Sequence, residues 1–89
     1  MAVLLITYDC DPSEQDCEKI LDFIKSSKTW AKLSEYSYAI QSEETPQEIL
    51  QKLTPCLSDR SRLFVFNLTR PYAGIRGTAP MFWLEKMLA

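Results

Sequence analysis

Residues 2–8 are apolar at nearly every position, so an extended strand made from them has apolar side chains on both faces. This pattern is typical of a central strand that is covered above and below. The strand ends at Asp9, and a helix start signal follows. Asp11 is the expected N-cap, Pro12 the first helical residue and Glu14 the acidic partner of a capping box.

The remaining periodicity predicts six more elements. In chain order they are a helix with its apolar stripe over 17–24 that ends near Ser26, strands over 29–33 and 36–41, a helix from Thr45 that ends by Ser58, a strand over 62–68, and a helix opened by Pro80. Thr45 and Glu48 repeat the capping-box signal, and Pro55 is expected to bend or shorten the last turn of its helix.

The order strand, helix, strand, strand, helix, strand predicts an α+β fold of ferredoxin-like βαββαβ type with an additional C-terminal helix. At 89 residues the chain has room for a single domain, residues 1–89. In this two-layer sandwich both helices cover one sheet face. Because the first and last strands are apolar on both sides, we expect the C-terminal tail and a second subunit to share the cover of the other face, which makes a homodimer.

Composition excludes some classes of protein and of catalytic mechanism. The net charge is −2, and the longest apolar runs fall far short of the ~20 residues of a membrane span. Residues 1–8 lack the positive start of a signal peptide, so we expect a cytoplasmic protein without membrane contact. The chain has no histidine, which excludes catalysis that needs a histidine base. Its three cysteines lack zinc-site spacing, and we expect three free thiols.

Asp9 follows a buried strand directly, where a scaffold commonly presents a functional carboxylate. With Asp11 it has the oxygen ligands that Mg²⁺ prefers. An aspartate at a strand-to-helix junction is also a common cap or turn residue, and the spacing leaves both interpretations open. Cys10 lies between these two carboxylates, whose charge disfavours a thiolate, so a structural role is expected for it rather than a nucleophilic one.

Charge is distributed unevenly, with a net −6 over residues 1–59 and +4 over 60–89. Arg70, Tyr72 and Arg76 have the composition of a loop that contacts nucleic acid, since arginine binds phosphate and tyrosine stacks on bases. A solvated surface is the alternative. The cluster Met81, Phe82 and Trp83 is expected to pack on the sheet or to form part of a partner site.

Several parts of the chain carry a resemblance, namely the apolar strand that ends in Tyr8-Asp9, the helix after it, Trp30, the strand with Ser37 to Ile40, the Thr45-Pro46-Gln47-Glu48 start and the strand over 63–68. Together they resemble the small CRISPR-associated adaptation-nuclease family (Cas-two). The likeness is greatest to its SinR-like branch, which stands near the VapD toxin nucleases. It implies a homodimer joined through sheet faces, with the two Asp9 side chains near the dimer axis. On that resemblance Asp9 is the catalytic and metal-binding candidate.

Three functions follow as alternatives. The first is a non-catalytic homodimeric subunit or adaptor with a protein or nucleic-acid partner. The second is a magnesium-dependent nuclease for RNA or DNA built around paired Asp9. The third is an unrelated binding domain. The acidic residues after Asp9 repel a phosphate backbone and speak against the nuclease, whereas the arginines of 60–76 favour an anionic partner.

Overall fold

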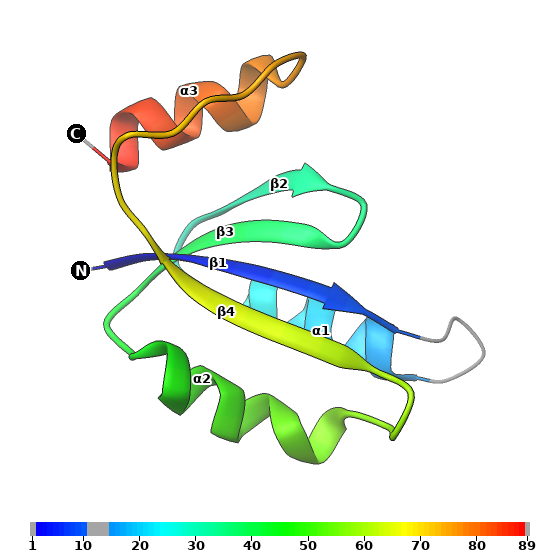
Figure 1. Ribbon diagram of the computed structural model, residues 1–89. Helices are drawn as coiled ribbons and strands as arrows, with labels where there is room; N and C mark the ends of the chain where they lie inside the picture. Colours follow the sequence, from blue (N-terminus) through cyan, green and yellow to red (C-terminus); the bar gives the residue numbers. More distant parts are fainter. Residues whose placement is uncertain (1, 11–14, 89) are drawn as a thin grey trace.

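The computed structural model describes residues 2–10 and 15–88 of the chain (Figure 1). The elements are, in order, β1 (Ala2–Asp9), α1 (Asp16–Lys25), β2 (Trp30–Ser34), β3 (Ser37–Ser42), α2 (Pro46–Leu53), the short 3₁₀ helix η1 (Thr54–Cys56), β4 (Arg62–Leu68) and α3 (Thr78–Met87). All seven predicted elements are present, and β2 and β3 begin one residue later than the sequence pattern indicates.

The four strands form one antiparallel sheet in the order β2-β3-β1-β4. β1 and β2 therefore run parallel with β3 between them, and β3 and β4 run parallel with β1 between them. β1 is central, as its two apolar faces predict, and pairs along its length with β3 on one side and β4 on the other. The fold is thus α+β, with a four-stranded antiparallel sheet and three α-helices.

The main core lies between the sheet and the first two helices. Alternate residues of β1, namely Leu4, Ile6 and Tyr8, point to this side. They pack against the buried stripes of α1 and α2, which are Ile20, Ile24, Ile49 and Leu53. Because each helix buries only one face, a single layer of two helices suffices to exclude water from this side of the sheet.

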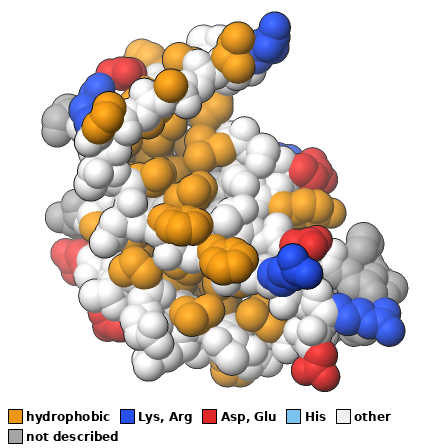
Figure 2. All heavy atoms as spheres, viewed as in Figure 1, with side chains coloured by type: hydrophobic (Ala, Val, Ile, Leu, Met, Phe, Trp, Pro, Cys, Tyr) orange, Lys and Arg blue, Asp and Glu red, His pale blue; other side chains and the backbone are white. Residues whose placement is uncertain are grey.

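The other sheet face is covered in part by α3. Leu84 of α3 packs with Val3 of β1 and Ala39 of β3 in a second buried cluster. The expectation that the tail covers this face is confirmed for the part that lies under α3. On β4, Phe64 and Phe66 stay 58% and 51% exposed. Figure 2, viewed as Figure 1, shows apolar side chains that gather on the sheet beyond α3.

Capping explains where the helices begin and end. Thr45 forms the predicted capping box with Glu48, in which each side chain accepts a hydrogen bond from the other residue's backbone N–H, at 3.1 and 3.0 Å. Pro55 lies within η1, so the α-helix ends at Leu53, as the proline predicts. The predicted cap of α1, made by Asp11 with Pro12 and Glu14, lies outside the described residues. α1 itself begins at Asp16.

The expectation of three free thiols is wrong. Cys10, just after β1, and Cys17, in the first turn of α1, form a disulfide, and Cys56 remains a free cysteine. The two Cα atoms lie 5.8 Å apart, within the range that a disulfide needs. An odd cysteine count concealed this pair, because spacing alone does not report which residues meet in space.

Within the part of the chain that the structure describes, no helix is both long and apolar enough to cross a membrane.

The disulfide predicts a thiol count. In denaturant without reductant, protein purified without reductant should react with one equivalent of a thiol reagent, at Cys56, and after reduction with three. Mass spectrometry after alkylation measures both numbers. A Cys56→Ser variant should give none before reduction and two after it. Three reactive thiols before reduction would contradict the disulfide.

Candidate functional site

Asp9 is the last residue of β1 and lies exposed at the end of the central strand. It shares its sheet face with Thr7, on the side away from α1 and α2. In the antiparallel register Asp9 lies opposite Arg62 of β4. Both residues line a shallow cavity of about 220 Å³ together with Phe64. The candidate carboxylate therefore lies at the edge of the apolar surface that α3 leaves open.

Arg62 is the cross-strand neighbour of Asp9. Opposite charges on directly paired residues attract each other across two strands. A divalent cation at Asp9 would lie near this guanidinium and be repelled by it. The second predicted ligand, Asp11, lies outside the described residues. Across 2–10 and 15–88, no three His, Cys, Asp or Glu side chains form a group that could hold a metal ion. Of the two predicted Mg²⁺ ligands, the described residues include Asp9 alone.

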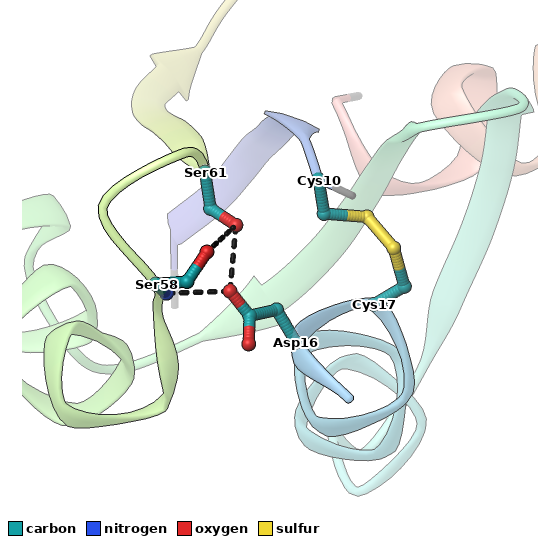
Figure 3. Close-up of a disulfide and its surroundings, with 5 residues drawn as sticks. All are labelled: Cys10, Asp16, Cys17, Ser58 and Ser61. Atoms are coloured by element: carbon teal, nitrogen blue, oxygen red, sulfur yellow. Dashed lines mark hydrogen bonds between the residues drawn. A yellow bond between two sulfur atoms is a disulfide. The ribbon is translucent and has the colours of Figure 1, made fainter. Parts of the chain in front are cut away.

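Asp16 is a buried acidic residue, and the sequence analysis gave it no such role. Its Oδ2 atom accepts a hydrogen bond from the backbone N–H of Ser58 at 2.5 Å and another from the Ser61 hydroxyl at 2.7 Å (Figure 3). The hydrogen bond from Ser61, and after it the one from Ser58, holds the pKa of Asp16 below its ordinary value. The first turn of α1 is thereby tied to the loop that leads into β4.

The disulfide fixes the same helical turn from the other side. Cys17 follows Asp16 directly, and its bond to Cys10 joins α1 to the end of β1 (Figure 3). Cys10 is buried in the main core, and Cys17 packs against it. The structural role expected for Cys10 agrees with this placement. The segment that carries Asp9 is therefore anchored within one residue of its carboxylate.

Two of the three predicted nucleic-acid-binding residues converge, and they do so on an acidic partner. The Arg70 guanidinium bonds the Glu85 carboxylate at 2.5 Å, and the Tyr72 hydroxyl donates to the same carboxylate at 2.8 Å. Arg70 also donates from Nε to the carbonyl oxygen of Leu88 at 2.9 Å, at the C-terminal end of α3. The hydrogen bond from Arg70, more than the one from Tyr72, lowers the pKa of Glu85.

Arg76 lies apart from this cluster in the sequence, exposed in the loop before α3 with a φ of 60°. A phosphate that approached Arg70 and Tyr72 would also meet the negative charge of Glu85. The observed role of Arg70 and Tyr72 is to attach the loop after β4 to α3. A cation at the negative end of a helix is favourable, and Arg70 supplies one there.

The sequence analysis missed a cluster of three tyrosines on the helix-covered side of the sheet. Tyr8, Tyr36 and Tyr38 line a groove between α1 and the β2–β3 hairpin. The signal was available: Tyr36 and Tyr38 alternate, which places both on one face of a strand. What the sequence did not show is that the β1–β3 register brings Tyr8 beside them.

The chain was compared with models of protein families, with curated proteins and with solved structures, and none of the three comparisons found a match.

Asp16 predicts a pH dependence of stability. Its pKa is lower in the folded chain than the ordinary 3.8, so its contribution to stability is complete above pH 3.8 and is lost as the pH falls through the folded-state pKa. Asp16→Asn removes the charge, so its urea midpoint should lie below that of the parent at neutral pH. The difference should shrink well below pH 3.8.

Asp22→Asn is the matched control for this experiment, because Asp22 lies exposed on the same helix. Its midpoint should follow that of the parent at every pH. A gap between Asp16→Asn and the parent that stays constant down to strongly acidic pH would contradict the assignment of the titrating group to Asp16.

Proposed function

We propose that this chain is a non-catalytic homodimeric module, a subunit or adaptor, with a ferredoxin-like fold. The observation that carries the proposal is the apolar surface on the outer face of β1 and β4 that α3 leaves uncovered. We call this surface the open face and define it by Leu5, Phe64 and Phe66. In the register, Leu5 lies opposite Phe66, so the three side chains are neighbours on one side of the sheet.

The ferredoxin-like part of the proposal is supported by topology. α1 connects β1 to β2, and α2 connects β3 to β4. In each case the two connected strands are parallel and a third strand lies between them, which is the split βαβ arrangement. Two such units interlock in one antiparallel sheet, and α1 and α2 pack on the same side of it. α3 is the addition to that arrangement.

The open face has the properties of an interface. Phe64 and Phe66 lie with ring centroids 6.3 Å apart and nearly parallel planes, and both are more than half exposed. Full burial of one phenylalanine side chain is worth about 1.5–3 kcal/mol, so leaving two of them in water is costly. Clustered exposed apolar side chains of this kind mark interaction surfaces.

A second copy of the chain suits the open face because its charged border is self-complementary. A two-fold interface places the same patch on both subunits, so each residue can meet a different one of the partner. The border of the open face carries one acidic and one basic residue, Asp9 and Arg62. In a two-fold pair, the Asp9 of one copy can pair with the Arg62 of the other while the phenylalanines pack together.

Membership of the Cas-two family, in its SinR-like branch near VapD, stays a proposal. Its support is the Tyr8-Asp9 end of a central strand beside a face that is open to a second copy. The cytoplasmic location stays a prediction too. The Cys10–Cys17 disulfide speaks against it, because disulfides persist mainly in oxidising compartments.

A charge on the open face tests the homodimer. Sedimentation at micromolar concentration should give twice 10.3 kDa for the parent and 10.3 kDa for Phe66→Glu, because an interface has no water to solvate the buried carboxylate. Phe82→Glu is the matched control, since Phe82 is 75% exposed on α3, and it should stay a dimer. A monomeric parent contradicts the proposal, as does a dimer that Phe82→Glu dissociates and Phe66→Glu does not.

The placement of Asp9 favours the magnesium-dependent nuclease as the second candidate. Asp9 borders the open face next to Phe64, so a pair formed through that face can bring two Asp9 carboxylates toward each other. Such a dimer would offer Mg²⁺ two carboxylate ligands, one Asp9 from each chain. Arg62, directly opposite Asp9 in the register, opposes this function because its positive charge repels a cation, and we therefore prefer the adaptor.

Asp9→Asn separates the two functions. For a nuclease, Mg²⁺ should raise the melting temperature of the parent, and Asp9→Asn should lose both this rise and the cleavage of RNA or DNA at low salt. For an adaptor, Asp9→Asn should change stability by about 1 kcal/mol or less, the scale of a surface ion pair, with no metal response in either form. Asp22→Asn is the control for general charge effects. Metal-independent melting and no cleavage by the parent would exclude the nuclease.

A further inference from the structure

We propose that the outer edge of β4 pairs with the same edge of a second copy of the chain, so that two sheets join side by side into one antiparallel sheet. β4 is the last strand in the order of the sheet, and Figure 1 shows it as the outermost strand on the side away from β2. This contact goes beyond the proposed function, because the open-face dimer stacks two sheets through side chains and leaves the backbone of the β4 edge unused.

The register of the sheet shows which backbone groups of β4 point outward. The Tyr8 N–H donates to the Tyr36 carbonyl at 2.9 Å, so Tyr8 directs its backbone groups to β3. Because this direction alternates along an antiparallel strand, the odd-numbered residues of β1 bond to β4. Their partners in the register are the even-numbered residues of β4. The N–H and C=O groups of Leu63, Val65 and Asn67 therefore point away from β1.

Within the described part of the chain, these outward groups have no backbone hydrogen-bond partner. β1 is the strand that pairs with β4, and the backbone hydrogen bonds outside helices and strands leave out Leu63, Val65 and Asn67. β4 also lacks two features that commonly block an edge, since it contains no proline and its single charged residue, Arg62, is its first. A strand that reaches this edge therefore meets donors and acceptors ready to pair.

A two-fold axis at Val65 satisfies all of these groups at once. With the axis perpendicular to the sheet, Val65 lies opposite Val65 of the other copy, and Leu63 lies opposite its Asn67. Each opposed pair then exchanges N–H···O=C bonds in both directions. An axis at Phe64 would leave Asn67 without a partner in the other β4, and an axis at Phe66 would leave Leu63 without one. The outward groups are thus self-complementary about Val65, which identifies a second copy as the partner.

The same register pairs the exposed aromatic side chains. Phe64 of each copy lies opposite Phe66 of the other in a non-hydrogen-bonded pair, where Cα atoms approach to about 4.5 Å and side chains are closest. Within one chain these two rings already lie 6.3 Å apart, and both are more than half exposed. Aromatic pairs across strands stabilise a sheet. Arg62 lies opposite Leu68, so the paired strands bring no like charges together.

Amide hydrogen exchange tests the pairing. Exchange is run on the parent at millimolar concentration, quenched and read by NMR. The outward N–H groups of Leu63, Val65 and Asn67 should exchange slowly, because pairing withdraws them from water. The N–H groups of Phe64 and Phe66 bond to β1 and should exchange slowly whether or not β4 pairs. Outward amides that exchange as fast as those of an unstructured chain would overturn the proposal.

A proline assigns the slow exchange to the edge. Asn67→Pro removes an outward N–H from an exposed residue and no bond to β1, a position that an edge strand tolerates. Leu63 and Val65 should then exchange at least about tenfold faster than in the parent. Asn67→Thr keeps the N–H, is the matched control and should exchange as the parent does. Equally slow exchange in Asn67→Pro and the parent would refute the pairing, because the protection would come from within one chain.

A mixed-label sample tests the register without any variant. In an equal mixture of isotope-labelled and unlabelled parent chains, the Hα atoms of Phe64 and Phe66 in different copies should give an intermolecular NOE, since they face each other in a non-hydrogen-bonded pair. An NOE between the two Phe64 Hα atoms instead, or no intermolecular NOE from β4, would contradict the axis at Val65.

Failure of the edge pairing is distinguishable from failure of the open-face dimer. Asn67→Pro leaves the open face intact, so it should still sediment at micromolar concentration as the parent does. A micromolar dimer whose outward amides exchange fast retains the open-face dimer and refutes the edge pairing. A parent that is monomeric at micromolar concentration, yet shows slow outward exchange at millimolar concentration that Asn67→Pro abolishes, supports the edge pairing and contradicts the open-face dimer.

Discussion

β1 has apolar side chains on both faces and lies in the middle of the sheet, so water has to be excluded from both sides of one strand. On one side α1 and α2 achieve this completely, with Leu4 and Ile6 fully buried. On the other side a single helix, α3, has to cover four strands and reaches only part of them. The architecture and the proposed partner surface both follow from this imbalance between two layers of cover.

Polar side chains hold the ends of these layers in place. Asp16 and the disulfide attach α1 to the loop before β4 and to the end of β1. Arg70 and Tyr72 attach α3 to the loop after β4 through Glu85. Charged residues that resemble candidates for chemistry in the sequence are therefore used for assembly of the fold. Among the sequence-predicted site residues, Asp9 stays exposed on the surface that the layers leave open.

Local signals were predicted well from the sequence, whereas pairings between distant residues were not. The Thr45 capping box and the helix stop near Pro55 depend on neighbours within four positions, and both are present. The disulfide was missed because it depends on how close the end of β1 lies to the first turn of α1. The contacts of Asp16 with Ser58 and Ser61 span more than forty positions, and no periodicity indicates them. The same holds for Glu85, which meets Arg70 only because α3 folds back on the sheet.

The two edges of the sheet differ in their readiness to accept another strand. β2 is short, and its register with β3 is interrupted between Lys32 and Ser34, which together with the lysine discourages pairing with a foreign strand. β4 is longer and keeps an unbroken register with β1 from Arg62 to Leu68. Its outward N–H and C=O groups therefore form a regular hydrogen-bonding row. Growth of the sheet by strand addition is thus guarded against at β2 and left open at β4.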